Sequence, residues 1–375
     1  MILGIEASHA AKPQRTGVEE VCRQVILALQ KIVPPEVRVV LYSHVPSGDL
    51  FGQLPPNWQE KVLLWRPKKL WSQIRLAREL RKNPPDIFFA PGQLLPFFLP
   101  RSLQTAVYLH DSAFKVVPKT YKFWGRQYLK LMNRWIVRRA NLIITSTEFN
   151  KAELKKYYGA RAAQKTQIAP LAYDRERYHS NVPVFSPIEL EQKFKITKPY
   201  LIYVGRIEDK KNAATIVEAF DAARVKLDFQ LVLAGKPGYG YVEHIKPKIE
   251  SSPFKQDIKE LGWTASEDLP RLLRSARALV FPSRYEGFGL PVLESMAVGT
   301  PVIVSGIPAL REVGGGAASY VESQNSADLA QKMAESLVDS PARVSQINLG
   351  LERIKLFSWE TTARAVYAAL SSCQK

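Results

Sequence analysis

The sequence has 375 residues and a net charge of +18, and 46% of its residues are hydrophobic. This length and apolar content can build a large core, which predicts two domains or one unusually large one. The sequence contains neither a run of about eighteen apolar residues nor a basic start followed by a long apolar stretch, so we expect no spanning helix and no signal peptide.

Cysteine and metal-ligand patterns are sparse. The two cysteines, Cys22 and Cys373, lie near opposite ends of the chain and form no disulfide framework, which favours a reducing cytoplasm. No Cys-x-x-Cys, His-x-x-x-His or Asp-x-Asp pattern occurs, so the sequence predicts no protein-held metal and no cofactor.

The positive charge is concentrated in the first half of the chain. Residues 1–175 contain 28 Lys and Arg against 12 Asp and Glu, whereas residues 176–375 contain 25 against 23. This asymmetry predicts a polyanionic partner for the first half, namely nucleic acid, acidic lipid headgroups or a phosphorylated acceptor. Ordinary solvated charge is the alternative interpretation.

Short apolar strands alternate with helices along the whole chain. In the first half we expect helices such as 18–32 and 147–158, and strands at 1–7, 37–43, 86–92, 105–111 and 141–147. The second half repeats the scheme, with helices near 212–224, 266–276 and 290–298, and strands at 200–206, 230–235, 278–283 and 301–306. Strands that are apolar throughout favour parallel sheets with both faces covered.

A composition change marks the boundary between two domains. Residues 169–200 are polar, rich in proline and only weakly periodic, so we interpret them as a linker. We expect one domain over 1–175, a second over 176–355, and a final amphipathic helix within 356–375 that Ser358 caps. Because ligands of such sheets bind beyond the carboxyl ends of strands, polar clusters that follow strands are candidate site residues.

The segment FPSRYEGFGLPVLESMAVGTPVI, residues 281–303, holds two glutamates between a predicted strand and a predicted helix. Glu286 lies in a loop whose glycines let backbone N–H groups approach a ligand. Pro291 suits the first position of a helix, and we expect Glu294 in the first turn, beside an N-terminus that attracts phosphate. Two carboxylates flanking a phosphate site suit sugar hydroxyls, which predicts a nucleotide-sugar with one ring for each glutamate.

At this point the sequence resembles the family 4 retaining glycosyltransferases, which have the GT-B fold and a Glu-x7-Glu signature. The segments YVGRIEDKKN (203–212), 261–322 and FSWETTARA (357–365) carry the resemblance, which covers nearly all of the second half. The first half matches more loosely, through RTGVEEV, YLHDSAF and ANLIITSTEFNKAEL, and is closest to the mannosyltransferase-like subgroup.

The resemblance implies an α/β protein of GT-B architecture, with two Rossmann-like parallel-sheet domains facing across a cleft. The domain over 1–175 would be on the acceptor side, and the domain over 176–355 would bind the nucleotide-sugar. The helix within 356–375 would cross back to the first domain.

The resemblance also implies roles for the Glu-x7-Glu segment. Glu286 would contact hydroxyls of the transferred sugar, and Glu294 would contact the ribose. The backbone that meets the diphosphate and sugar would be that of Gly287, Phe288, Gly289 and Leu290. The alternatives are an exposed loop glutamate for Glu286 and a buried helix-capping role for Glu294.

Positive charge follows the first strand of the second half. In the resembling family, cations placed like Arg206 and Lys211 bind the diphosphate. Fixed cations in a dry site stabilise the negative charge of a departing diphosphate more in the transition state than in the ground state, which removes the need for a metal. Lys210 is a competing choice that fits the spacing of the motif less well, and a basic turn before a helix is the alternative.

Three residues of the first half complete the candidate site. His110, at the end of the strand 105–111, resembles the histidine that faces the transferred sugar, with a structural histidine at a strand end as the alternative. Its neighbour Asp111 is a candidate substrate contact, with capping of the next segment as the alternative. Gly17, between the first strand and the first helix, lets the backbone approach the diphosphate or the acceptor, although an ordinary turn glycine is the other interpretation.

These features together predict a metal-independent, retaining hexosyltransferase. Mannose is our first choice of sugar, the donor would be GDP-mannose or a UDP-sugar, and the acceptor would be a glycan or a polyprenyl-linked glycan in cell-surface polysaccharide synthesis. No convincing nucleophile is visible, so we favour a front-face mechanism in which the departing phosphate accepts the proton of the acceptor.

Two other classes of protein remain as alternatives. A basic nucleic-acid-binding protein would suit the charge of the first half, but no DNA- or RNA-binding signature occurs, and we expect no nucleic-acid partner. A non-catalytic nucleotide-sugar-binding module would keep Glu294 and the cations while losing His110 or Glu286, yet all of them are present.

Two basic stretches of the first half are flanked by aromatic residues. In residues 119–140 the cations recur every four positions, at Lys122, Arg126, Lys130, Arg134 and Arg138. At helical spacing beside them stand Trp124, Tyr128, Leu131 and Trp135, and residues 65–82 form a similar stretch. This pattern is typical of a helix on an anionic membrane surface, which predicts a cytoplasmic protein bound peripherally to the inner face of the cell membrane. The alternative is that the aromatic stripe packs into the core.

Overall fold

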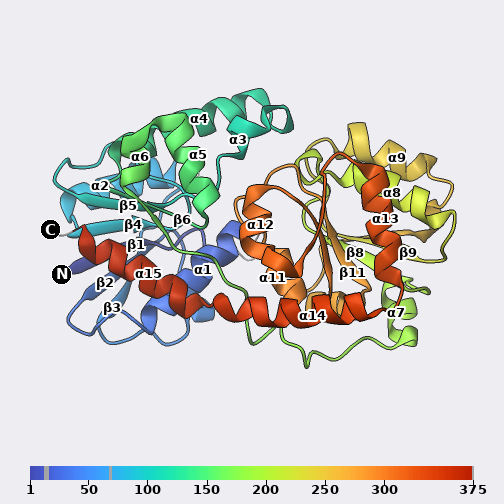
Figure 1. Ribbon diagram of the computed structural model, residues 1–375. Helices are drawn as coiled ribbons and strands as arrows, with labels where there is room; N and C mark the ends of the chain where they lie inside the picture. The colour runs from blue at the N-terminus through green and yellow to red at the C-terminus, as the bar shows by residue number, and fades with distance from the viewer. Residues whose placement is uncertain (12–16, 67–69, 374–375) are drawn as a thin grey trace. The chain divides into compact units, whose positions relative to one another are not determined.

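The computed structural model describes residues 1–11, 17–66 and 70–373 (Figure 1). Residue contacts divide the chain into two compact units. The first unit contains residues 1–112, 123–172 and 357–375, and the second unit contains residues 113–122 and 173–356. The chain therefore enters the second unit for a short segment at 113–122 before it completes the first.

The first unit is built on a parallel sheet. Its described strands lie in the order β3-β2-β1-β4-β5-β6-β7, and every neighbouring pair is parallel. The strands are β1 (Ile2–Glu6), β2 (Arg38–Ser43), β3 (Trp58–Val62), β4 (Ile87–Ala90), β5 (Gln104–Tyr108), β6 (Leu142–Thr145) and β7 (Thr166–Ile168). All residues of β4 and β6 are buried, because helices cover both faces of the sheet.

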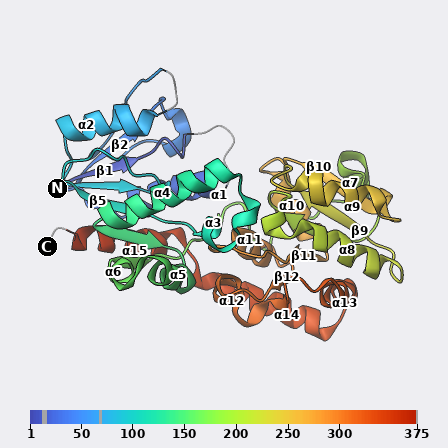
Figure 2. The same ribbon diagram turned by 90° about the horizontal axis from the view of Figure 1, so that it is seen from above.

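The first unit also contains helices. They are α1 (Gly17–Gln30), α2 (Ala77–Lys82), which continues the turn Ser72–Leu76, α4 (Phe123–Arg139), α5 (Glu148–Tyr158), α6 (Ala160–Gln164) and α15 (Trp359–Ser372). Residues of α2 and α4 such as Leu80 and Ile136 join one buried cluster with Phe88 and Val107 of the sheet. On the other side α15 packs against α1, as Figures 1 and 2 show.

The final helix begins where the sequence predicts. The side chain of Ser358 accepts a hydrogen bond from the backbone N–H of Thr361, which confirms the predicted cap. The Thr362 hydroxyl donates to the carbonyl of Pro170 at 2.5 Å, so α15 is attached to the segment that follows β7 within the first unit.

The second unit is built on another parallel sheet, with its described strands in the order β10-β9-β8-β11-β12-β13. The strands are β8 (Tyr200–Val204), β9 (Gln230–Ala234), β10 (Ile258–Gly262), β11 (Ala278–Phe281), β12 (Val302–Ser305) and β13 (Ser319–Val321). The helices include α7 (Pro187–Phe194), α8 (Ala213–Arg224), α9 (Lys246–Ser251), α10 (Asp268–Ser275), α11 (Leu290–Ala297), α12 (Pro308–Gly314), α13 (Ser326–Leu337) and α14 (Pro341–Arg353), with α3 (Ala113–Val116) grouped beside them.

The predicted fold class is confirmed, because each unit is a parallel sheet with helices between successive strands. None of the described helices combines the length and the apolar character that a membrane span requires. Four strands were not predicted, and they are the edges of the two sheets: β3, β7, β10 and β13. Their residues are only partly buried, so they lack the apolar runs by which the central strands were recognised.

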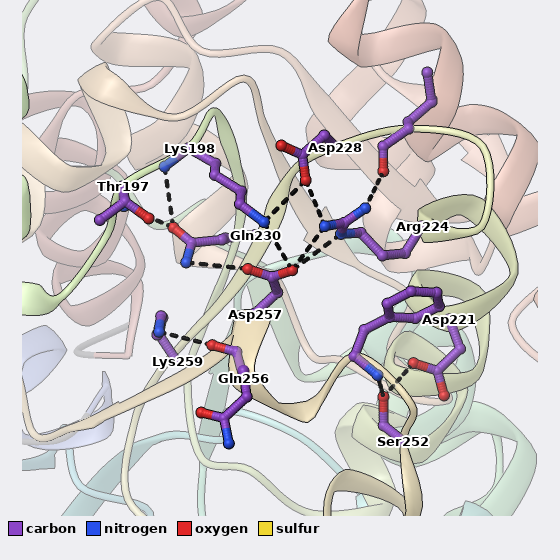
Figure 3. Close-up of polar contacts among 12 residues, drawn as sticks. Thr197, Lys198, Asp221, Arg224, Asp228, Gln230, Ser252, Gln256, Asp257 and Lys259 are labelled. Carbon is purple, nitrogen blue, oxygen red and sulfur yellow. Dashed lines mark hydrogen bonds and ion pairs between the residues drawn. The ribbon is translucent and has the colours of Figure 1, made fainter.

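An ion-pair network joins the amino ends of β8, β9 and β10 (Figure 3). One carboxylate oxygen of Asp257 lies 3.1 Å from Lys198 Nζ and 2.8 Å from a terminal nitrogen of Arg224. The same two cations contact Asp228, whose side chain is far more exposed, at 67% against 14% for Asp257. The amide oxygen of Gln230 accepts hydrogen bonds from the backbone N–H groups of Thr197 and Lys198. Because ligands bind at the opposite, carboxyl end of such strands, this network is structural.

The Asp257→Asn variant is expected to melt roughly 3 to 6 °C below the wild-type protein at pH 7. Burial raises the pKa of Asp257, but hydrogen bonds and charge from Lys198 and Arg224 outweigh burial and hold it below its ordinary value. A lowered carboxyl pKa contributes stability that is complete above the unfolded pKa of about 4 and is lost as pH falls through the folded pKa. Calorimetry should therefore show the difference shrinking below about pH 4. Asp228→Asn is the matched control, with the same partners at an exposed position, and an equal effect from it would contradict the argument.

Candidate functional site

The predicted donor-site residues of the second unit follow two neighbouring strands. Arg206 and Lys211 come after β8, and Glu286 comes after β11, which pairs directly with β8. Since both strands run parallel, their carboxyl ends lie at one edge of the sheet, and the two loops meet there.

An ion pair between Lys211 and Glu286 is the centre of this edge. Lys211 Nζ lies 2.5 Å from Glu286 Oε1, and both side chains are largely buried, at 17% and 9% exposure. The same ammonium lies 5.0 Å from the ring centre of Phe281, the last residue of β11. One carboxylate oxygen of Glu286 is thus bound to a fixed cation, and this contact holds the other oxygen in position. The sequence implied separate roles for these two residues and did not predict their pairing.

Asn212 connects the two loops and was assigned no role from the sequence. It is buried, adopts a left-handed backbone conformation with φ of 62°, and precedes α8. Its amide nitrogen donates to the carbonyl of Ser323, and its amide oxygen accepts from Arg284 Nε at 3.1 Å. Arg284 also donates its backbone N–H to the carbonyl of Lys210 at 3.0 Å. An asparagine that ends a run of charged residues after a strand is the sequence signal for such a left-handed turn.

Arg206 differs from Lys211 in its surroundings. Its backbone carbonyl accepts a hydrogen bond of 2.5 Å from the hydroxyl of Tyr203, and burial raises the pKa of this tyrosine well above its usual value. The Arg206 residue itself is exposed. The fold therefore fixes the backbone of Arg206 and leaves its guanidinium accessible to a ligand.

The loop from Gly287 to Gly289 is buried and leads into α11. Gly289 has a φ of 109°, which favours glycine, and a Cβ there would lie 2.5 Å from Leu310 Cδ2, so the Leu310 side chain would have to move. Leu290 is the first helical residue and Pro291 the second, so Glu294 is the fifth. The expectation that Glu294 lies within the first turn is thus wrong by one residue, and its side chain begins the second turn. Leu290 and Glu294 are both partly exposed.

His110 lies at the carboxyl end of β5 in the first unit. Its Nε2 is 2.8 Å from the carbonyl oxygen of Pro91, and its ring stacks on Tyr108. Burial lowers the pKa of His110 to about 4, although the Pro91 carbonyl opposes this change. The imidazole is therefore neutral at pH 7. Because a carbonyl only accepts hydrogen bonds, Nε2 carries the proton and Nδ1 is the accepting nitrogen.

The other two predicted residues of the first unit are Gly17 and Asp111. Gly17 is the exposed first residue of α1, and a Cβ there would meet nothing within 4 Å, so the fold does not itself require glycine. Arg15 and Thr16 of the same motif lie outside the described residues. The backbone carbonyl of Asp111 accepts from Gln93 Nε2 at 3.4 Å, and the residue is partly exposed.

The described part of the chain contains no group of three or more His, Cys, Asp or Glu residues that could hold a metal ion. Cations in the loops at the carboxyl ends of the second sheet's strands include Arg206 and Lys211.

Two family models match the sequence and together cover most of it. The model described as Glycosyltransferase Family 4 matches residues 15–177, and the model described as Glycosyl transferases group 1 matches residues 187–352.

Curated relatives include mannosyltransferases. The chain is 28% identical over 312 residues to O-antigen chain mannosyltransferase B of Escherichia coli, which covers 82% of this chain and 80% of that protein. It is 34% identical over 143 residues to the serotype-specific mannosyltransferase WbdA of Escherichia coli. That match covers 37% of this chain and 17% of WbdA.

Solved structures share the fold at low sequence identity. Sucrose-phosphate synthase from Thermosynechococcus elongatus superposes with a TM-score of 0.75 at 18% identity, covering 99% of this chain and 98% of that one. HepE from Anabaena, solved in complex with UDP-glucose, gives a TM-score of 0.75 at 17% identity, covering 99% and 100%.

Proposed function

The chain belongs to glycosyltransferase family 4, and from this premise we propose that it is a retaining mannosyltransferase that uses a nucleotide-diphosphate sugar. The acceptor is a glycan or a lipid-linked glycan in cell-surface polysaccharide synthesis. The observation that carries this proposal is the buried Lys211–Glu286 pair beside a loop of backbone N–H groups that opens a helix. This arrangement offers a cation, a sugar-binding carboxylate and an anion-binding N-terminus within one loop pair.

The leaving group determines what the cations do. As the bond from the anomeric carbon to the diphosphate oxygen breaks, its electron pair stays on the diphosphate. Lys211, held by Glu286, and the accessible Arg206 are the charges that stabilise this developing anion. Glu286 uses its remaining hydrogen-bonding capacity for hydroxyls of the transferred sugar, and Glu294 accepts from the ribose.

Retention is proposed to follow a front-face route. The acceptor oxygen forms its bond to the anomeric carbon on the side from which the diphosphate leaves, and the acceptor proton passes to the departing phosphate oxygen. His110 supports this route because a neutral imidazole at pH 7 binds a hydroxyl of the transferred sugar without adding charge. Asp111 and Gly17, the exposed first residue of α1, are also proposed to contact the substrate.

Mannose is proposed as the sugar because relatives named as mannosyltransferases match the chain. We therefore expect GDP-mannose as the donor, with UDP-glucose, the ligand of the HepE complex, as the competing choice. The test is to incubate the protein with a panel of nucleotide-sugars and measure nucleotide release. Release from GDP-mannose at least about tenfold faster than from the other donors would support the proposal. Equal release from all, or none, would contradict it.

Activity is expected to survive EDTA, because Arg206 and Lys211 supply the positive charge that a metal would otherwise give to the diphosphate. The measurement compares GDP release with and without millimolar EDTA, and then with added manganese. Release should change by less than about twofold. Complete loss that manganese restores would show that the mechanism needs a metal.

An anionic membrane surface is proposed as a partner of the first unit, at the inner face of the cell membrane. On α4, Trp124 is 81% exposed, and Phe123, Tyr128 and Leu131 are also largely exposed. Trp135 differs from the prediction, because it packs on Phe97 and donates its indole N–H to the carbonyl of Pro96. The aromatic stripe is thus divided into an exposed amino-terminal part and a core-facing carboxyl-terminal part.

The second basic stretch, 65–82, also contains both buried and exposed apolar side chains. Trp71 is buried and donates its indole N–H to the carbonyl of Leu63, whereas Leu70 and Ile74 are exposed at 62% and 44%. Residues 67–69 of this stretch lie outside the described residues. The exposed apolar side chains beside cations in both stretches support a surface that can enter a lipid interface.

A further inference from the structure

Side chains hold the backbone that continues from β5, which ends at Tyr108, to His110. The hydroxyl of Thr145 donates to the carbonyl of Leu109 at 2.9 Å. Nδ2 of Asn150 donates to the carbonyl of His110 at 3.0 Å. Both donating residues are buried. The position of His110 therefore depends on side-chain contacts as well as on the sheet.

Gln93 holds the same backbone through its side-chain amide. Its Oε1 accepts the backbone N–H of His110 at 3.2 Å. Its Nε2 lies 3.4 Å from the carbonyl oxygen of Asp111 and 3.4 Å from Oδ1 of the buried Asn133. A backbone N–H only donates and a carbonyl only accepts, so this orientation of the amide makes every one of these contacts favourable. Neither a carboxylate nor an apolar side chain could satisfy them together.

The backbone of Gln93 is strained. Its φ is 59°, in the left-handed region that glycine adopts freely and that a long side chain rarely enters. Strain of this kind is concentrated at functional sites, where the surrounding contacts over-determine it. Glycine would relieve the strain at this position but would lose all the contacts of the amide. The strained backbone thus accompanies a side chain that holds a residue of the candidate site.

Residues 91–93 hold His110 at two points. The carbonyl at position 91 lies 2.8 Å from Nε2 of the ring, while the amide at position 93 contacts the backbone. Between them, Gly92 packs against the ring of His9, where a Cβ would lie 2.5 Å from Cγ. His9 is itself held by the buried carboxylate of Glu6, which lies 2.7 Å from Nδ1. The position of Nδ1 in His110 therefore depends on the conformation of this confined segment.

We propose that Gln93 is a positioning residue for His110, whose amide fixes the backbone that carries the imidazole and so holds Nδ1 where it accepts a hydrogen bond from a hydroxyl of the transferred sugar. This inference rests on the proposed function and adds to it the residue on which the action of His110 depends. Gln93 acts through His110 and needs no contact with the substrate. Because small displacements of a positioned group weaken the transition state most, its loss lowers kcat more than donor affinity.

The test is the variant Gln93→Gly, which removes the amide and adopts the left-handed backbone without strain. We expect kcat for GDP release from GDP-mannose to fall about tenfold, while the donor KM stays within about threefold. The melting temperature should stay within about 3 °C of the wild-type value. Gln93→Glu keeps the length and the accepting oxygen but loses both donated hydrogen bonds, so it should be slowed to a similar extent. Gln53→Gly, at an exposed loop position of the same unit, is the matched control and should leave kcat and KM unchanged.

A double-variant cycle tests whether Gln93 acts through His110. In the His110→Ala background, Gln93→Gly should lower kcat by less than about twofold, because the ring that Gln93 positions is already absent. A purely structural role of Gln93 would instead give the same loss in both backgrounds, together with a lower melting temperature.

Nitrogen-15 NMR of histidine-labelled protein gives a readout that is independent of activity. The wild-type protein should show His110 in one neutral tautomer, protonated at Nε2, because the carbonyl at position 91 accepts that proton. Gln93→Gly should bring the two ring-nitrogen signals of His110 closer together, since a ring that is no longer held in one position samples both tautomers. His110 signals that do not move in this variant would contradict the positioning role.

These outcomes separate the inference from the proposed function. If the wild-type protein releases GDP from GDP-mannose and Gln93→Gly does so equally fast, the positioning role is wrong and the proposed function stands. The same conclusion follows if the losses in the cycle are additive. If the wild-type protein releases no GDP from GDP-mannose, the proposed function fails, and the role of Gln93 within it fails too.

Discussion

The Lys211→Ala variant is expected to turn over GDP-mannose about a hundredfold more slowly than the wild-type protein. That is the scale on which a fixed charge acts on a charge that develops in the transition state. The effect has a second source here, because Lys211 is also the partner of the buried Glu286 carboxylate. Glu286→Ala and Arg206→Ala should each lower turnover by roughly the same factor, with the fold intact.

Lys210→Ala is the matched control, since it removes the same charge one position away in the turn Asp209–Lys211. It should lower turnover by less than about threefold. The double variant Lys211→Ala with Glu286→Ala should lose much less than the product of the single losses, because the two side chains act as one unit. Wild-type-like turnover in the Arg206 and Lys211 variants would contradict the assignment of the donor site.

Charge reversal on α4 is expected to remove most of the binding to anionic membranes. The wild-type protein should sediment with phosphatidylglycerol vesicles at low salt and remain in solution with neutral ones. Each cation near the surface contributes about 1 kcal/mol, so the five cations of the stripe supply at most roughly 5 kcal/mol, which salt weakens. Arg126→Glu with Lys130→Glu changes the stripe by four charges and should remove most of the sedimentation.

The control for this experiment places the same charge change elsewhere. Lys226→Glu with Lys255→Glu alters two exposed lysines of the second unit and should leave sedimentation nearly unchanged. A Trp124→Ala variant should weaken binding without changing the net charge, because Trp124 is the most exposed aromatic side chain of the stripe. Equal sedimentation with neutral vesicles, or none with either kind, would show that the basic first half serves another partner.

The central strands of both sheets could be predicted because burial on two faces requires apolar residues at every position, as in the ALVF of β11. The edge strand β3, with the sequence WQEKV, could not be recognised, because only its first residue is buried. Strand pairing supplies its hydrogen bonds from β2, which is a tertiary contact that a local pattern does not contain.

The candidate site, too, could be predicted only in part from the sequence. Local chemistry, namely glycines that a tight loop requires, a proline near a helix start and polar residues directly after strands, identified the residue types and their order along the chain. Local chemistry could not predict which side chains contact each other. Lys211 and Glu286 are 75 positions apart and pair only because β8 and β11 are neighbours in the sheet.

The sequence by itself determined the two parallel sheets, the positions of the loops that follow their strands and the excess of positive charge in the first half. These depend on the period of apolar residues and on composition, which are local or additive properties. Only the tertiary structure decided that Trp135 packs inward while Trp124 does not, and that Glu6 holds His9 beside the segment that holds His110. Burial and pairing arise from contacts between segments far apart in the chain, so a residue's neighbours in sequence do not specify them.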